Sequence, residues 1–429
     1  MISPHFPPDT SAGTHRVRLL APHLPASGWA ATVVTVAPEA YEGRLDPDLA
    51  SLVPDTLRVV RAPAWRAATA RCFGFGDLGL RALTGIRAAC ERLLASERFD
   101  ALFITVYPTY PAILGPAIRA RHRIPFVLDY QDPWVGAWGR DVGGGANGAP
   151  DLRSRMSRAV AARLEPRVVR GADALTAVSA RTYEDVLARV PRAAPRACAA
   201  IPLGFEPADL EGLRRAPRPN RLFDAADGLV HVCYVGTLLP MGIPVLRQVL
   251  SALRTIRTAS PAVYGRLRLH FLGTSNGRDP AAAPRVLPIA RDLGVDDIVR
   301  EVAPRLDYLD ALNVQVQASA LLLMGSTEPH YTPSKVFPAI LSRRPIVAAF
   351  HEASSAVTLL RSPAAAAAVC TFADEASLDA IGPRVARAFE DLACGRLAPG
   401  PVAIPEALRP WSAEALAGRL AGVLDAVAS

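Results

Sequence analysis

The sequence predicts an α/β protein made of two doubly wound, Rossmann-like domains that face one another across a cleft. Short apolar runs rich in β-branched residues alternate with helical patterns through both halves of the chain, which is typical of parallel sheets covered by helices. The alternation stops once, at residues 206–227, which are rich in Pro, Arg and Asp and have no apolar period. The length of 429 residues also suits two domains.

Composition narrows the possible functions. Half of the residues are apolar and 21% are charged, as in an ordinary globular protein. The net charge of +8 could serve nucleic acid, an anionic membrane surface or phosphorylated ligands. The charge forms no basic tail and only 6% of residues are aromatic, so nucleic acid is the least favoured of the three.

The cysteines and the apolar runs bear on location. Six cysteines are scattered without a CxxC pair, which favours a reducing compartment and argues against a disulfide framework or a zinc site. The first residues lack the apolar core of a secretory signal. No apolar run reaches the roughly 18 residues of a membrane span. We therefore expect a cytoplasmic protein, with peripheral membrane contact left open.

The elements of the first half lead to a ligand-binding edge. The first strand is either missing or reduced to Met1 and Ile2, and a loop of small residues follows up to Gly13. In open α/β sheets, ligands bind at such carboxyl-edge loops. The predicted strands are residues 31–37, 57–63, 101–106, 125–128, 172–179 and 198–205, and the predicted helices are 14–25, part of 71–98, a segment ending near 121, and 151–170.

The second half restarts the same pattern. We place the first domain at residues 1–205, the linker at 206–227 and the second domain at 228–403. Residues 404–429 form a terminal helix that could pack back on the first domain, with a possible break at Pro410. The predicted strands are 229–235, 267–272, 298–302, 320–324, 345–350 and 367–372, and the predicted helices are 243–257, 306–318 and 378–392.

One lysine stands out. The chain has 48 Lys and Arg residues, of which only Lys335 is lysine, so 48 − 1 = 47 are arginine. Lys335 follows Pro333 and Ser334, which suit the first turn of a helix after the 320–324 strand. A helix start binds phosphate readily, and a compact ammonium fits where a planar guanidinium does not. An isolated surface lysine in an Arg-rich protein is the alternative.

Several short motifs together resemble a known family. The motifs are Phe6-Pro7-Pro8…Gly13-x-x-Arg16, the segments at 172–179 and 202–205, and Pro333-Ser334-Lys335 followed by 344–347. In their order along the chain, they resemble glycosyltransferases of the GT-B architecture, and within them the large retaining family 4 group. The resemblance covers the whole chain. It implies transfer of a sugar from a nucleoside diphosphate sugar, bound mainly by the second domain, to an acceptor on the first.

The resemblance also implies a donor site and no metal or other cofactor. Fixed donors and close backbone approach would stabilise the departing diphosphate. Arg16 could instead be a surface charge on its helix. Asp46-Pro47-Asp48 spells a metal-nucleotide signature of another fold, but we interpret it as a solvated turn. The residues expected to bind the donor are Gly13, Arg16, Gly236, Thr237, Gly273, Thr274, Ser326, Pro333, Ser334 and Lys335.

The catalytic candidates are ionisable groups at predicted strand ends. Asp129 and Asp132 stand where the family often has a histidine, and either could activate an acceptor hydroxyl. Asp132 could instead cap the turn at Pro133. Glu328 could replace a missing family glutamate, and His330 is a further candidate or a solvated loop residue.

Two departures from the family pattern keep alternatives open. Residues 238–242 lack the Arg and Lys that the family often has there, and Pro338 stands at the place of a second glutamate. A nucleotide-sugar epimerase of the same fold, or a GT-B protein that binds a nucleotide without catalysis, would also fit. The acceptor could be a metabolite, a lipid-linked intermediate or a polysaccharide.

Overall fold

A computed structural model describes residues 1–72, 76–135, 152–275, 279, 281–328, 335–362, 365–401 and 403–428, with only the backbone for 152–158. The chain divides into two compact units. Unit 1 comprises Met1–Gly204 together with Ala413–Ser429, and unit 2 comprises Phe205–Ser412. All strand pairs in both units are parallel, which confirms the predicted class of two Rossmann-like units.

The sheet of unit 1 is joined through a single residue. Ile2 bridges Val34 on one side and Ile104 on the other, and its N–H donates to the Phe103 carbonyl oxygen at 2.7 Å. It therefore connects the β1–β2 pair to the four-stranded row β3-β4-β5-β6. The strands are β1 (Thr32–Val36), β2 (Arg58–Ala62), β3 (Leu102–Thr105), β4 (Phe126–Tyr130), β5 (Ala174–Ala177) and β6 (Ala197–Ala200).

Both faces of this sheet are buried, because successive strand residues point to opposite sides. Phe103 packs with one apolar cluster and Ile104 with the other. The helices of this unit are α1 (Thr14–Leu20), α2 (Pro47–Ala50), α3 (Ala67–Cys72), α4 (Leu78–Ser96), α5 (Leu114–His122), α6 (Leu152–Gly171), α7 (Ala180–Arg189) and α17 (Ala413–Ala428), with the 3-10 turns η1 (Ala21–Ser27), η2 (Pro38–Ala40) and η3 (Tyr110–Ile113).

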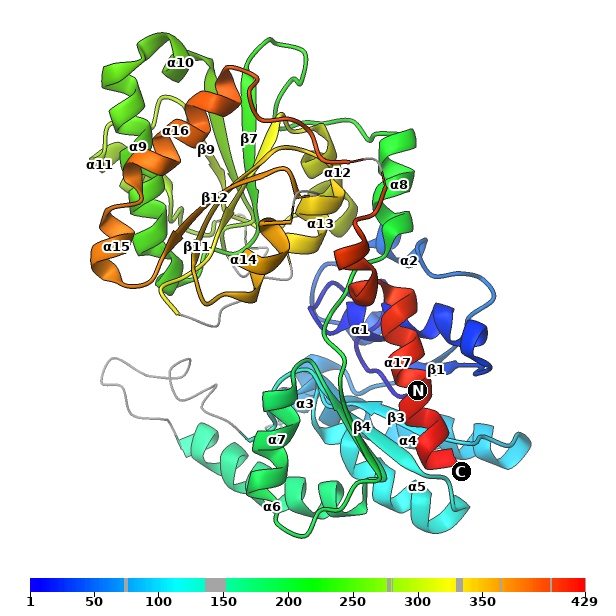
Figure 1. The fold of residues 1–429 in the computed structure, drawn as a ribbon. Coiled ribbons are helices and arrows are strands. Elements are labelled where there is room, and N and C mark those ends of the chain that lie inside the picture. The colour runs from blue at the N-terminus through cyan, green and yellow to red at the C-terminus, as the bar shows by residue number, and fades with distance from the viewer. Residues whose placement is uncertain are drawn as a thin grey trace. The chain divides into compact units, whose positions relative to one another are not determined.

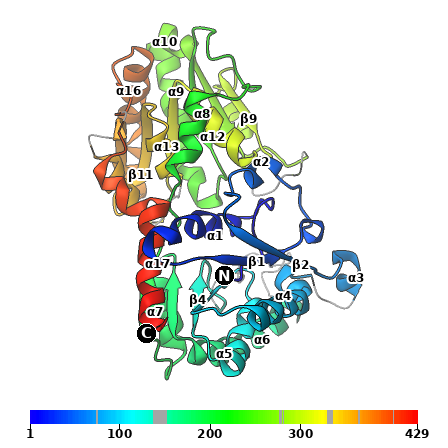
Figure 2. The same cartoon turned by 90° about the vertical axis from the view of Figure 1, so that its right-hand side faces the viewer.

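The last helix belongs to the first unit. Helix α17 lies beside α1, as Figures 1 and 2 show, and its Leu416 and Leu420 share an apolar cluster with Val17 and Leu20. The predicted first helix, 14–25, is shorter than expected. Pro22 and Pro25 lack the N–H that an α-helix needs, so the chain continues as the 3-10 turn η1.

Unit 2 holds one six-stranded sheet in the order β12-β11-β10-β7-β8-β9. The order grows outward in both directions from the adjacent pair β7 and β10, the classic arrangement of a doubly wound sheet. The strands are β7 (Val230–Val235), β8 (Leu267–Leu272), β9 (Val299–Val302), β10 (Ala320–Met324), β11 (Ile346–His351) and β12 (Ala367–Phe372).

Helices cover both faces of this sheet (Figure 1). Leu322 of β10 packs among residues of α9 and α16, whereas Leu321 and Leu323 pack with α12, α13 and α14. The helices are α8 (Pro207–Arg215), α9 (Ile243–Ala259), α10 (Pro261–Arg266), α11 (Leu287–Asp292), α12 (Tyr308–Gln317), α13 (Val336–Leu341), α14 (Ser355–Leu360), α15 (Glu375–Asp379) and α16 (Gly382–Ala393), with η4 (Pro240–Gly242) and η6 (Glu406–Trp411).

The segment expected to be a linker is folded into unit 2. Helix α8 lies within residues 206–227, and its Leu210 and Leu213 are buried in the same cluster as Leu312 and Phe337. Two leucines in nine residues give no convincing period in the sequence, but they suffice to dock a short helix.

Candidate functional site

The carboxyl edge of the unit 2 sheet has a natural ligand-binding position. Where β7 and β10 adjoin, the chain leaves the sheet in opposite directions, and such switch points are where open α/β sheets bind ligands. Gly236 and Thr237 follow β7, and Gly325 and Ser326 follow β10. Three of the predicted donor residues therefore lie at this point, and Gly273 and Thr274 follow the adjacent strand β8.

Lys335 lies directly against this backbone. Its Nζ is 3.2 Å from the Thr237 carbonyl oxygen and 5.2 Å from the centre of the Tyr234 ring. The Tyr234 hydroxyl donates to the same carbonyl oxygen at 3.0 Å. A Cβ atom on Gly236 would come within 2.1 Å of the lysine Cε. Glycine at position 236, with φ +130°, is therefore what makes room for the lysine.

The ammonium of Lys335 is held in an unfavourable place. Burial, together with the nearby positive charge of Arg305, lowers the pKa of Lys335 from 10.5 to about 8. Within the described part of the chain, no carboxylate lies within ion-pair distance of its Nζ. A desolvated cation with no counter-charge, at a switch point, indicates a site for an anion.

Arg305 provides a second positive charge in this region. It follows β9, and a Cβ on Gly273 would lie 3.7 Å from the Arg305 Cα and 3.8 Å from the Gly236 Cα. Sequence reasoning looked for a second cation at residues 238–242 and missed this one. The signal was present, since Arg305 stands just beyond the carboxyl end of the predicted strand at 298–302.

The hydroxyl of Thr274 has a structural role inside unit 2. It is fully buried and donates to Glu301 Oε1 at 2.5 Å. Glu301 also accepts backbone N–H bonds from Arg285, Val286 and Leu287, each at 2.9 Å, at the start of α11. Thr274 therefore holds the loop after β8 in place, and its side chain does not face a ligand.

The remaining predicted site residues of unit 2 differ in their burial and in their hydrogen bonds. Ser326 is buried, and its Oγ accepts the Glu328 N–H at 3.2 Å, which closes a turn after β10. The Glu328 side chain is exposed. Half-buried Thr237 donates its hydroxyl to the Ser275 carbonyl oxygen at 3.5 Å. His330, Pro333 and Ser334 lie outside the described residues.

In unit 1, Arg16 and Asp129 bind each other. Arg16 Nε donates to Asp129 Oδ2 at 2.8 Å, and Arg16 Nη2 donates to Oδ1 at 2.5 Å. Thr176 Oγ1 donates to the same carboxylate at 2.7 Å, and Arg16 also donates to the carbonyl oxygens of Ile201 and Pro202. The side chains are 1% and 0% exposed, so neither can reach a ligand.

This pair corrects two expectations. Arg16 is neither a donor-binding group nor a surface charge, and Asp129 is not available as an acid or base. The charges compensate one another across 113 residues of sequence, and they tie α1 to β4 inside the unit. Asp132 differs, because it is exposed and has no hydrogen-bond partner among the described residues, and partial loss of hydration raises its pKa.

The loop before α1 contains a group that the sequence analysis did not single out. Gly13 lies so close to Tyr107 that a Cβ would come within 2.7 Å of its ring. On the same ring stacks His5, at 5.3 Å between ring centres, and His5 Nδ1 is 2.6 Å from Asp9 Oδ2. Gly13 thus serves close packing in a loop that carries an imidazole.

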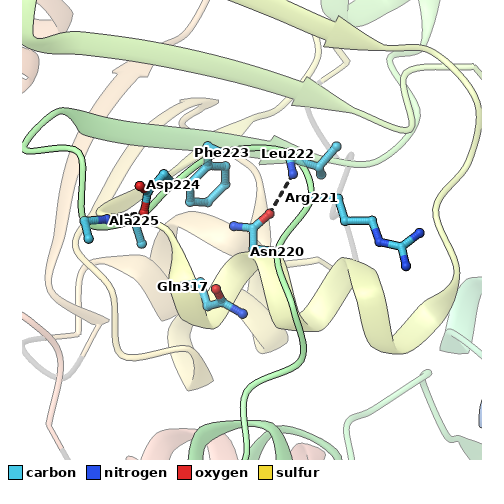
Figure 3. Close-up of a pocket in the computed structure, with 8 residues that line it drawn as sticks. Asn220, Arg221, Leu222, Phe223, Asp224, Ala225 and Gln317 are labelled. Carbon is cyan, nitrogen blue, oxygen red and sulfur yellow. Dashed lines mark hydrogen bonds between the residues drawn. The ribbon is translucent and has the colours of Figure 1, made fainter.

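The opposite edge of unit 2 has an open hollow of about 630 Å³ (Figure 3). Its lining comes from the segment before β7 and from Gln317, which ends α12 just before β10. The hollow therefore lies at the amino ends of the central strands, away from Lys335. The lining residues are Asn220, Arg221, Leu222, Phe223, Asp224, Ala225, Ala226 and Gln317.

Behind Phe223 lies a buried pair of histidines. His231 Nδ1 and His270 Nε2 are 2.9 Å apart, and His231 Nε2 is 3.0 Å from Asp227 Oδ1. The Phe223 ring stacks on His231 with 4.5 Å between centres. Burial and the neighbouring charge of His231 lower the pKa of His270 to about 4.

Two further searches concern metals and membranes. Within the described ranges, no three His, Cys, Asp or Glu side chains converge as metal ligands would. Asp46 of the Asp-Pro-Asp sequence caps α2 by accepting the Leu49 N–H at 3.2 Å. In the same ranges, no helix combines the length and the apolar character needed to cross a bilayer.

Comparisons with known proteins agree with this architecture. Residues 12–204 match the sequence profile of the Glycosyl transferase 4-like domain. No curated protein matches the chain. Among solved structures, HepE of Anabaena in complex with UDP and glucose is 16% identical over 98% of each chain, with a TM-score of 0.54. The UDP-forming α,α-trehalose-phosphate synthases of Burkholderia vietnamiensis and Burkholderia xenovorans are also similar, at 12% and 10% identity, 92% and 93% coverage of this chain, 94% coverage of each of theirs, and TM-scores of 0.53 and 0.56.

The two units share one fold with these solved structures, the two-domain GT-B architecture that the sequence predicted. Within this fold, residues 12–204 of the first unit are similar to a glycosyl transferase 4-like domain.

Proposed function

We propose that this protein transfers a sugar from a nucleoside diphosphate sugar to a hydroxyl acceptor, and that the diphosphate binds beside Lys335. The observation that carries the proposal is the desolvated ammonium of Lys335, next to Arg305 and the backbone of Gly236, without a carboxylate partner in the described residues. Such an arrangement is unfavourable in the free protein and becomes favourable when an anion is bound.

The charges fit the chemistry of the transfer. The bond between the sugar C1 and the phosphate oxygen breaks, the electron pair leaves with the diphosphate, and the acceptor oxygen loses its proton as it bonds to C1. Positive groups fixed before the reaction stabilise the charge that develops on the leaving group. Lys335 and Arg305 supply such charge without a metal ion, and we propose a metal-independent reaction.

Relatives of the same fold suggest which donors to test first. The solved HepE complexes contain UDP, UDP-glucose, or UDP with glucose. We propose a donor of the same chemical class for unit 2 and an acceptor bound by unit 1. Retention of anomeric configuration and a cytoplasmic location are the expectations that the family resemblance and the scattered cysteines support.

The test measures nucleotide binding at Lys335. UDP and GDP are added to the wild type, Lys335→Ala and Arg305→Ala, and the melting temperature is followed. We expect one nucleotide to raise the melting temperature of the wild type, Lys335→Ala to lose the increase and Arg305→Ala to lose part of it. Arg254→Ala, which removes an exposed charge from α9, is the matched control and should keep the full increase. Equal increases in all four proteins would exclude this site.

A separate measurement distinguishes transfer from epimerisation. An epimerase of this fold needs acid and base groups around the sugar, and the commitment of Asp129 to Arg16 removes one of the candidates. UDP-glucose incubated without an acceptor should therefore yield no second nucleotide sugar. Its appearance would replace transfer by isomerisation as the function of this chain.

A further inference from the structure

The loop of residues 3–13 occupies the switch point of unit 1. It follows Ile2, which adjoins β1 and β3, so the loop leaves the sheet where the strand order turns. This position in unit 1 corresponds to that of Gly236 in unit 2. The loop is therefore placed where a second ligand of the enzyme would bind.

Asp9 is the anchor of this loop. Its carboxylate Oδ2 lies 2.6 Å from His5 Nδ1 and accepts hydrogen bonds from Ser11 Oγ at 2.5 Å and Thr14 Oγ1 at 3.0 Å. Burial by itself would raise the pKa of Asp9, but the hydrogen-bonding and electrostatic interactions with His5, together with the hydrogen bonds from Ser11 and Thr14, outweigh it and lower the pKa to about 2. Asp9 is thus an anion at any physiological pH.

This anion fixes the tautomer of His5. Because a carboxylate only accepts, the neutral imidazole must carry its proton on Nδ1, which leaves a lone pair on Nε2. Among the described residues, nothing hydrogen-bonds to Nε2, and the His5 side chain is 15% exposed. A histidine with only a structural role usually has both nitrogens satisfied.

The orientation of the ring is also fixed. His5 stacks against the ring of Tyr107, at 5.3 Å, and against that of Tyr41, at 6.4 Å. The Tyr41 hydroxyl donates to the Pro4 carbonyl oxygen at 2.8 Å, so the loop itself is anchored to the same ring. Side chains that bind a ligand are usually held in the binding orientation before the ligand arrives, as the Nε2 lone pair of His5 is here.

The charged groups around the ring are few. Asp77 lies near the ring, and its carboxylate caps α4 by accepting the Leu80 N–H at 2.9 Å. Arg61 donates to the Pro7 carbonyl oxygen at 2.7 Å. Neither residue hydrogen-bonds to His5.

We propose that His5, oriented by Asp9, binds a hydroxyl group of the acceptor through Nε2, and that the acceptor is a polyhydroxy compound such as a sugar. The inference rests on the proposed transfer function and assigns its acceptor side to a residue outside the expected site. His5 acts here as a positioning residue: it accepts the hydrogen bond of one hydroxyl and thereby orients the acceptor on unit 1.

The first experiment tests the lone pair without any assumption about the donor. Diethyl pyrocarbonate reacts with an accessible, unprotonated imidazole nitrogen, and peptide mapping reports which histidine is modified. We expect His5 to react, buried His270 to remain unmodified, and glucose, galactose, mannose or glycerol to slow the reaction at His5. An unreactive His5, or no protection by any of the four, overturns the proposal.

The second experiment uses matched variants. Asp9→Asn removes the negative charge that holds the imidazole proton on Nδ1, so the lone pair of His5 is no longer kept on Nε2. We expect Asp9→Asn and His5→Ala to raise the acceptor KM about tenfold, the loss of a hydrogen bond of about 1.4 kcal/mol. His5→Gln, whose amide oxygen can accept, should recover part of the loss.

Nucleotide binding separates the two proposals. Because Lys335 belongs to unit 2, the increase in melting temperature with UDP or GDP should be the same in Asp9→Asn, His5→Ala and wild type. Normal nucleotide binding with an unchanged acceptor KM overturns the role of His5 alone. Absence of nucleotide binding in the wild type overturns the proposed function instead.

Discussion

Replacement of Lys335 by methionine should make the free protein more stable while it removes nucleotide binding. Methionine keeps the length of the side chain and removes its charge. The pKa of Lys335 falls from 10.5 to about 8, and at about 1.4 kcal/mol per pH unit this is about 3 kcal/mol of destabilisation at pH 7. The lost hydrogen bond to Thr237 offsets about 1 kcal/mol, so a net gain of about 2 kcal/mol is expected.

The size of the expected effect is measurable. For a unit of this size, about 2 kcal/mol corresponds to an increase of roughly 4–8 °C in the melting temperature. The sign follows from proton binding. Between pH 8 and 10.5 the unfolded chain keeps a proton that the folded protein has released, so the wild type gains stability as pH rises through this window. The variant lacks this gain, and the difference between the two proteins should shrink toward pH 10.5.

Urea unfolding at pH 7 and pH 10 provides the measurement, with Arg254→Met as a control for loss of a surface charge. Other groups that titrate in this range are common to both proteins and cancel in the difference. A Lys335→Met protein that is less stable at pH 7, or a difference that does not change with pH, would refute a desolvated ammonium. With UDP or GDP present, the wild type should become as stable as Lys335→Met or more stable, because only the wild type binds the nucleotide.

Three other predictions follow from the same structure. Arg16→Met should destabilise the protein by about 3–5 kcal/mol in urea unfolding, because a buried carboxylate loses its partner; a second replacement of that carboxylate by Asn should restore part of the loss, and a change below 1 kcal/mol would contradict a buried pair. The low pKa of His270 means that, between pH 6.5 and about 4, the unfolded chain binds a proton that the folded protein does not. The free energy of unfolding of the wild type should therefore fall by up to about 3 kcal/mol as the pH is lowered through this range. His270→Gln should flatten this pH dependence, and an unchanged pH dependence in the variant would mean that the ring is solvated. Gly236→Ala should displace Lys335 and abolish the melting-temperature response to nucleotide, whereas Gly294→Ala, also at positive φ but with open space around it, should keep that response; loss in both would point to backbone strain instead.

The sequence predicted the strands and helices better than it predicted which side chains pair with one another. Alternation of strands and helices was enough for the two sheets, and the single lysine led to the switch point of unit 2. The pairing of Arg16 with Asp129 was beyond reach, because only the folded sheet brings residues 113 positions apart together. Each looked like a free functional group when considered alone.

Other errors have similar physical causes. His5 and Asp9 are four residues apart in a loop, where no periodic pattern reports that they meet. Arg305 was overlooked because the second cation was expected on the segment after β7, although the edge of a sheet collects side chains from every strand end. The docking of α8 depends on two leucines that are too few to produce an amphipathic pattern.

The division of the chain has a consequence for its synthesis. Unit 1 begins at the amino terminus but lacks α17 until residues 413–428 have been made, whereas unit 2 is continuous. All residues of unit 2 are therefore synthesised before α17, and the buried face of α1 stays uncovered until α17 has been made. A premature stop codon near residue 410 would leave unit 2 almost complete and would expose the apolar face of α1 in unit 1 to chaperones and proteases.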